Sequence, residues 1–151
     1  MNEIKVAENK TLKLTNVLSR VVLPEELGNL SVILTQMQNF IKSNNAQPIG
    51  PLVQAIRMGT GPDHVPEMYM MQQATQMISK MEPGYHMDAV LRVKNCLYAH
   101  YTGPLSKSQL ASAKLQIMAF ENDIKLTDSS YTIYVNQDDD EAVIDVFMET
   151  K

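Results

Sequence analysis

The 151-residue sequence is poor in the residue types that mark several common classes of protein. Its one cysteine, Cys96, cannot form an internal disulfide bond, which favours a reducing compartment. The N-terminal segment lacks the basic and apolar regions of a signal peptide. No apolar run approaches the ~20 residues that a membrane-spanning helix requires. We therefore expect a soluble, cytoplasmic protein with no membrane partner.

Positive charge is also scarce. Lys and Arg total 13 against 17 Asp and Glu, which gives a net charge of −4, and no basic run occurs. Proteins that bind nucleic acids usually gather Lys and Arg on one face, because neutralising phosphates dominates their affinity. No direct contact with nucleic acid is expected. Because no helix-turn-helix pattern precedes the domain, control of DNA would require a separate DNA-binding partner.

Patterns typical of metal and cofactor sites are missing as well. The three histidines, His64, His86 and His100, are not spaced as ligands with cysteine or with one another. Residues 59–61 have the glycines but not the strand–loop–helix context of a phosphate loop. The acidic run 138–141 lacks the spacing of a calcium loop. We predict no metal, no cofactor and no catalytic residue.

The spacing of apolar residues predicts two amphipathic helices. The first follows Pro24, which suits an initial helical turn because its missing N–H is not needed there. The second begins at Ser106, with Gln109 three residues later at the spacing of a capping box. Apolar residues at helical spacing predict the buried faces: Leu30, Ile33, Met37 and Phe40 in the first helix, and Leu110, Ala113, Ile117 and Phe120 in the second.

The two helices indicate an internal duplication. Both apolar sets have 3, 4, 3 spacing, and each member of the second set lies 80 positions after its counterpart. One strand-like segment precedes each helix and two follow it. These segments are Thr15–Leu18, Leu52–Ile56 and Glu67–Met70 in the first copy, and Lys94–Leu97, Tyr131–Val135 and Asp145–Met148 in the second.

This order predicts the fold class. We expect one α+β domain over residues 1–151, built from a duplicated strand–helix–strand–strand repeat with antiparallel sheets and helices on one side. Repeat one covers about 10–78 and repeat two about 86–151, with a joint near Pro83 and Gly84. Residues 59–63 and 136–141 are expected to form hairpin loops.

Strand alternation then sorts side chains onto two faces. Tyr131, Ile133 and Val135 are predicted to lie under the second helix. Aromatic and acidic side chains on the opposite face suit a flat, partly apolar and cationic ligand. An alternative interpretation is that the aromatic residues cover the joint between the copies while the acids face water. The predicted ligand-binding residues are Gln54, Glu67, Tyr69 and Met71 in the first copy, and Tyr98, His100, Thr132, Tyr134, Asp145 and Phe147 in the second.

Four segments resemble the DNA gyrase inhibitor-like (GyrI-like) family, whose domains also serve as effector-binding domains of bacterial transcription regulators. These segments are Gly50–Pro51, Tyr98–Pro104, Tyr131–Asn136 and Ile144–Phe147. The resemblance implies a pseudo-symmetric central cleft that binds hydrophobic, often cationic compounds near a buried acid. It also shows departures: Thr132 stands at a family carboxylate, and the second acid is the shorter Asp145. Recognition of a cation would then rest on Asp145 with Glu67.

The expected function is a stand-alone binding domain for hydrophobic small molecules, cations included, acting as a sensor or a sequestering protein. Two alternatives stay open. One is a small hydrolase in the same cleft, with Asp145 or Glu67 as the general base and Tyr134 or Tyr98 as the proton donor. The hydrolase is disfavoured because Thr132 stands where the resembling family has a carboxylate. The other is a protein-interaction module that uses the open sheet face.

Overall fold

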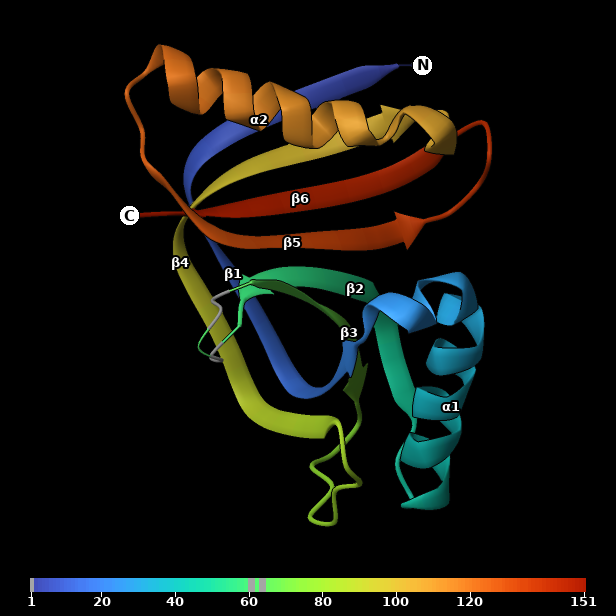
Figure 1. The fold of residues 1–151 in the computed structure, drawn as a ribbon. Helices are drawn as coiled ribbons and strands as arrows, with labels where there is room; N and C mark the ends of the chain where they lie inside the picture. Colours follow the sequence, from blue (N-terminus) through green and yellow to red (C-terminus); the bar gives the residue numbers. More distant parts are fainter. Residues whose placement is uncertain (1, 60–61, 63–64) are drawn as a thin grey trace. The chain divides into compact units, whose positions relative to one another are not determined.

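The computed structural model describes residues 2–59, 62 and 65–151 (Figure 1). Strands and helices follow the order β1 (Glu3–Val22), α1 (Leu30–Ser43), β2 (Pro48–Met58), β3 (Pro66–Ala74), β4 (Tyr85–Gly103), α2 (Gln109–Glu121), β5 (Leu126–Asn136) and β6 (Ala142–Thr150). The strand–helix–strand–strand order therefore occurs twice, and the predicted α+β fold with a duplicated repeat is confirmed. Neither helix of the described chain has the length and apolar content needed to cross a membrane.

The chain divides into two compact units, each with one α-helix, two whole strands and parts of the long strands β1 and β4. Lys13–Arg92 forms the contiguous unit, and Met1–Leu12 together with Val93–Lys151 forms the split unit. The long strands β1 and β4 each contribute residues to both units. Both contain asparagines in the left-handed region, including Asn16 (φ 49°) and Asn95 (φ 58°), a conformation that Asn tolerates better than most residues.

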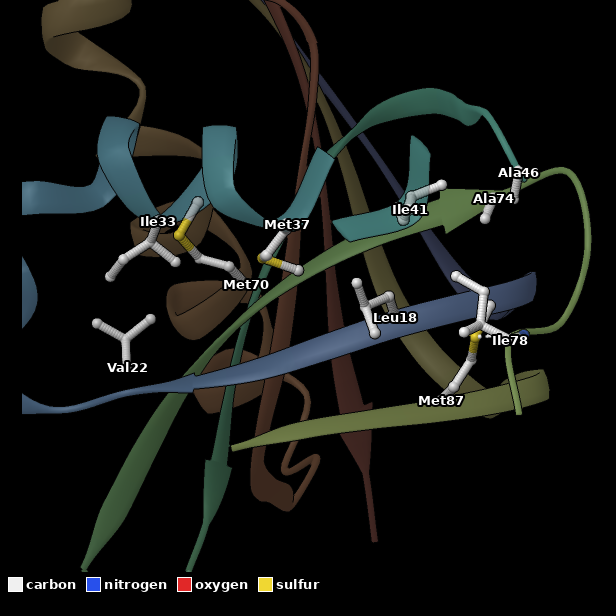
Figure 2. Packing of buried hydrophobic residues seen from close by; sticks show 10 residues of the cluster. All are labelled: Leu18, Val22, Ile33, Met37, Ile41, Ala46, Met70, Ala74, Ile78 and Met87. Atoms are coloured by element: carbon white, nitrogen blue, oxygen red, sulfur yellow. Dashed lines mark hydrogen bonds between the residues drawn. The ribbon is translucent and has the colours of Figure 1, made fainter. Parts of the chain in front are cut away.

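The core of the contiguous unit lies between α1 and one face of its sheet. Strand β3 pairs with β1 on one side and with β2 on the other. The fully buried Met37 and Ile41 of α1 pack against Leu18 and Met70, and burying one such side chain contributes roughly 1.5–3 kcal/mol. Figure 2 shows this cluster: Leu18, Val22, Ile33, Met37, Ile41, Ala46, Met70, Ala74, Ile78 and Met87.

The first helix begins later than predicted. Pro24 opens a 3-10 turn, Pro24–Asn29, and α1 starts at Leu30. Glu26 holds this turn in place, because its carboxylate accepts hydrogen bonds from Arg20 at 2.7 and 3.0 Å and from the Leu23 N–H at 3.1 Å. The Arg20 guanidinium and the Leu23 amide lower the pKa of Glu26 to about 2.

The split unit has the same plan with a different helix register. Strand β6 lies between β4 and β5, and α2 covers one face of that sheet. The helix buries Ala111, Leu115 and Ala119. Of the four residues predicted to be buried, Leu110, Ile117 and Phe120 are 48%, 59% and 84% exposed. The predicted face was wrong because α2 is apolar on two opposite sides, and the side with Leu115 and two small alanines is the one that faces the sheet.

The predicted start of α2 also needs correction. Leu105–Lys107 forms a 3-10 turn and α2 begins at Gln109. No side-chain hydrogen bond caps this helix start within the described chain, so the capping box predicted at Ser106 does not form.

The copies align with offsets that change along the chain. Buried Ile33, Met37 and Ile41 of α1 correspond to Ala111, Leu115 and Ala119 of α2, which lie 78 positions later rather than 80. The predicted equivalence of Leu30 with Leu110 and of Phe40 with Phe120 was therefore wrong. The first strands align 79 positions apart and the last strands 76 apart, because Arg20 pairs with Met70 as Ala99 pairs with Val146.

The shorter offset of the last strands arises in the hairpin loops. Residues 137–141 join β5 to β6, which pair antiparallel, so the predicted second hairpin is confirmed. Most of the first predicted loop, residues 60, 61 and 63, lies outside the described residues, as does His64.

Candidate functional site

Strand pairing shows which side chains share a face of each sheet. Residues directly opposite one another on antiparallel strands point to the same side. Ile144 and Val146 pack beneath α2, so their partners Tyr134 and Thr132 also lie on the helix side. The other side of the sheet is here called the helix-free face. It carries the residues that alternate with these four, which are Asp145 and Phe147 with their partners Ile133 and Tyr131.

The helix-free face of the split unit carries two rows of three side chains, of which Tyr131 and Ile133 are buried. In the first row, Phe147 of β6 lies between Tyr98 of β4 and Tyr131 of β5. In the second row, Asp145 lies between His100 and Ile133. The Tyr98 and Phe147 rings pack with their centroids 4.9 Å apart and their planes tilted by 48°. Four predicted site residues, Tyr98, His100, Asp145 and Phe147, are thus brought together.

The prediction was wrong about the face of Thr132 and Tyr134. Tyr134 packs against the buried cluster under α2 and is not beside Asp145. Tyr131 and Ile133, predicted to lie under the helix, are on the helix-free face instead. Strand β5 has large side chains on both faces, so alternation alone could not say which set faces the helix.

Asp145 is the centre of a polar cluster. Its Oδ1 atom accepts a hydrogen bond from the Tyr98 hydroxyl at 2.8 Å and lies 2.6 Å from Nδ1 of His100. A carboxylate accepts only, so the imidazole carries its proton on Nδ1 when it makes this bond. The Asp145 side chain is 21% exposed and that of His100 is 37% exposed. A negative charge is therefore oriented by two donors at a partly exposed position beside aromatic rings.

The phenol of Tyr98 stays protonated far above neutral pH. Burial raises its pKa to about 12, and the hydrogen bond to Asp145 and the charge of that carboxylate add to the effect. Tyr98 is consequently a neutral donor that fixes Asp145.

A pH titration can test this contact. The raised pKa of Tyr98 stabilises the folded protein fully below pH 10, and this stabilisation is lost as the pH rises from 10 to about 12. Alkali is therefore expected to destabilise the fold around Tyr98 and Asp145. We expect the Tyr98 pKa to fall toward 10 in Asp145→Asn. The measurement is tyrosinate absorbance, with Tyr98→Phe subtracted to isolate this residue. An unchanged Tyr98 pKa in Asp145→Asn would contradict the assigned hydrogen bond.

The equivalent face of the contiguous unit is less polar. Ser19, Val21, Tyr69 and Met71 take the places of Tyr98, His100, Asp145 and Phe147. Tyr69 therefore corresponds to Asp145, and the predicted match between Glu67 and Asp145 was wrong.

Three predicted residues of this unit, Glu67, Tyr69 and Met71, share its helix-free face. Arg57 lies opposite Glu67 and places its guanidinium carbon 4.4 Å from the centre of the Tyr69 ring. Gln54 does not join them: it pairs with Met70, a residue of the cluster under α1, so it lies on the helix side.

Sequence reasoning missed several residues of these faces. Ser19 is buried, and its hydroxyl has no hydrogen-bond partner among the residues that the structure describes. The predicted match of Thr15–Leu18 with Lys94–Leu97 already aligned Asn16 with Asn95, three positions before Ser19 and Tyr98, and both asparagines lie in the left-handed region. Tyr131 and Arg57 had no comparable signal.

The other reactive groups among the described residues give no second site. Cys96 is buried, and its pKa is raised by burial and by the charge of Glu149. Across residues 2–59, 62 and 65–151, no three His, Cys, Asp or Glu side chains gather closely enough to hold a metal ion.

Comparison by sequence alone finds no relative. No protein-family model matches the chain, and no curated protein matches it.

Comparison by structure finds the fold. EcmrR bound to DNA matches with a TM-score of 0.73 at 16% identity, over 98% of this chain and 57% of that one. The isolated EcmrR C-terminal domain matches with a TM-score of 0.67 at 14% identity, over 100% and 98% of the two chains. SAV2435 bound to tetraphenylphosphonium has a TM-score of 0.56 at 12% identity, over 99% and 94%. A hydrolase from Listeria innocua has a TM-score of 0.58 at 7% identity, over 99% and 92%.

These identities establish the fold alone. The predicted resemblance to the GyrI-like, effector-binding fold is confirmed at that level. The chain spans little more than half the length of the DNA-bound EcmrR chain.

Proposed function

We propose that the protein binds hydrophobic small molecules that carry a positive charge, and that the Asp145 carboxylate binds the charged group. The observation that carries the proposal is the Asp145 carboxylate, fixed by Tyr98 and His100 next to the Tyr98–Phe147 ring pair. Aromatic faces and a carboxylate both attract a cation, and the attraction strengthens where water is partly excluded. SAV2435, which shares the fold, is known in complex with tetraphenylphosphonium, a hydrophobic cation.

The geometry supports binding better than hydrolysis. Both donors of the cluster point at the same carboxylate oxygen, and the Tyr98 pKa of about 12 opposes formation of a phenolate at neutral pH. Tyr134, the other donor considered, lies on the helix side of the sheet. Acid–base catalysis needs a donor and a base that converge on a substrate rather than on each other.

A sensor role would need a further component. EcmrR was observed on DNA as a longer chain than this domain. By analogy, a sensor of this fold would transmit the binding of its ligand to a DNA-binding segment or partner. A sequestering protein would need no such segment or partner.

Tetraphenylphosphonium and its isosteric anion tetraphenylborate provide the test. By isothermal titration calorimetry we expect the phosphonium to bind at least about tenfold more tightly, a difference of ~1.4 kcal/mol. Asp145→Asn should weaken phosphonium binding about tenfold, because it removes the charge and keeps the shape. It should leave borate binding unchanged or tighter.

A second histidine–aspartate pair supplies the matched control. His86 and Asp88 lie 3.0 Å apart at an exposed position, and Asp88→Asn should leave both affinities unaltered. Equal affinities of the wild type for the two ions, or an unchanged phosphonium affinity in Asp145→Asn, would show that Asp145 does not recognise charge. Turnover of an ester substrate that Asp145→Asn abolishes would support the hydrolase instead.

A further inference from the structure

Helix α2 has a second apolar face that its own unit covers only in part. At about 100° per residue, Leu110, Ala113, Ile117 and Phe120 fall within an arc of about 80°. The buried residues of α2 lie on the opposite side of the helix. Leu110 and Ile117 are about half exposed, and Phe120 is 84% exposed. We call this set the outer stripe.

The equivalent helix shows that an apolar outer face is not required by the fold. At the positions 78 residues earlier, α1 carries Val32, Thr35, Asn39 and Lys42, all exposed and three of them polar. Both helices cover their own sheets with the opposite side. The outer stripe therefore serves something other than the packing of its own unit. Exposed apolar patches of this kind commonly mark contact surfaces.

The spacing of the outer stripe fits another helix. Its 3, 4, 3 pattern is that of one seam of a coiled coil. The pattern is also unchanged when it is read backwards. In an antiparallel pair of identical helices, Leu110 would face Phe120 of the other copy, and the small Ala113 would face Ile117.

The charges at the two ends of the stripe are self-complementary in the same arrangement. Lys107 precedes the helix and Glu121 ends it, the reverse of what the helix dipole favours. Neither takes part in an ion pair within the described residues, whereas Lys114 is already bonded to the Ile4 carbonyl at 2.8 Å. Antiparallel packing places Lys107 near Glu121 of the second copy. It also places the partially negative C-terminus of each α2 helix near the partially positive N-terminus of the other.

From these observations we propose that the protein forms a homodimer through antiparallel packing of its α2 helices along the outer stripe. The contact is isologous, so one patch serves both copies and the assembly closes at two. A 13-residue helix is only about 20 Å long, and its stripe buries less than the ~800 Å² per partner of a standard interface. The dimer is accordingly weak, with a dissociation constant in the range of about 1–100 µM.

Sedimentation velocity over a concentration series tests the dimer. We expect the wild type to pass from monomer to dimer, and Ile117→Glu to raise the dissociation constant more than about 100-fold, because it buries a charge at the centre of the stripe. The matched control is Asn39→Glu, at the equivalent position of α1, which should dimerise as the wild type does. Circular dichroism verifies that both variants are folded.

Charge exchange and cross-linking test the orientation. Lys107→Glu and Glu121→Lys should each weaken the dimer about threefold to tenfold, and the double variant should recover most of the loss. A mixture of Ala113→Cys and Ile117→Cys proteins should form the mixed disulfide faster than either protein links to itself. A wild type that stays monomeric at about 1 mM, or equal dimerisation of Ile117→Glu and Asn39→Glu, would overturn the proposal. Faster self-linking of each cysteine variant would overturn the antiparallel arrangement.

Discussion

Leu115→Ala is expected to lower the free energy of unfolding by about 2–5 kcal/mol, while Phe120→Ala changes it by less than about 0.5 kcal/mol. Leu115 is completely buried under α2, so its truncation removes apolar contacts and leaves a cavity. Phe120 is the larger side chain but is 84% exposed, and its truncation leaves the core intact.

Urea unfolding followed by circular dichroism measures both values. The protein is kept well below micromolar concentrations so that self-association does not add to the stability of the wild type. Sequence periodicity alone predicts the opposite order, since it assigns Phe120 to the core. Equal losses would contradict the observed burial of the two residues, and a greater loss in Phe120→Ala would mean that the helix lies in the register predicted from the sequence.

Phe147→Ala is expected to weaken binding of tetraphenylphosphonium and tetraphenylborate alike, by about 30-fold or more, which corresponds to ~2 kcal/mol. Phe147 lies at the centre of the row formed with Tyr98 and Tyr131, so it offers aromatic contact to a ligand of either charge. Asp145→Asn, in contrast, should affect only the cation. The two variants thus separate apolar contact from charge recognition.

Calorimetric titration with both ions measures the effect, and Tyr134→Leu is the control. It removes an aromatic ring from the same hairpin, on the side that packs beneath α2. Binding should survive this change at temperatures where the variant is folded. If Tyr134→Leu abolished binding while Phe147→Ala did not, the ligand would occupy the helix side, and the face assignment would be wrong.

The order of elements and the duplication could be predicted from the sequence because they depend on local signals. Apolar periodicity located both helices, and the turn residues separated the strands. The resemblance to the GyrI-like fold rested on short segments such as Tyr98–Pro104. Structural similarity to EcmrR and SAV2435 confirms the fold that those segments indicated.

Faces and registers could not be predicted because they depend on partners distant in the chain. In α2, Leu110 and Leu115 belong to opposite apolar faces, and only the sheet decides which of them is buried. In β5, Thr132 and Ile133 are equally plausible site positions until β6 pairs Ile133 with Asp145. Asp145, Tyr98, His100 and Phe147 were found because two strands with unambiguous alternation carry them.

The division of the chain into a contiguous and a split unit has a consequence during synthesis on the ribosome. Residues 1–12 belong with residues 93–151. This segment therefore has no folding partner while the 80 residues from Lys13 to Arg92 are translated. At 5–20 residues per second, translating those residues alone takes roughly 4–16 s.

An unpaired strand in a nascent chain is prone to associate with other chains. Within β1, Glu3, Lys5, Glu8 and Lys10 place charge of both signs along the waiting segment. Such charges discourage premature pairing between chains. The contiguous unit can meanwhile fold, so that residues 3–12 of β1 pair only after residues 13–92 have been made.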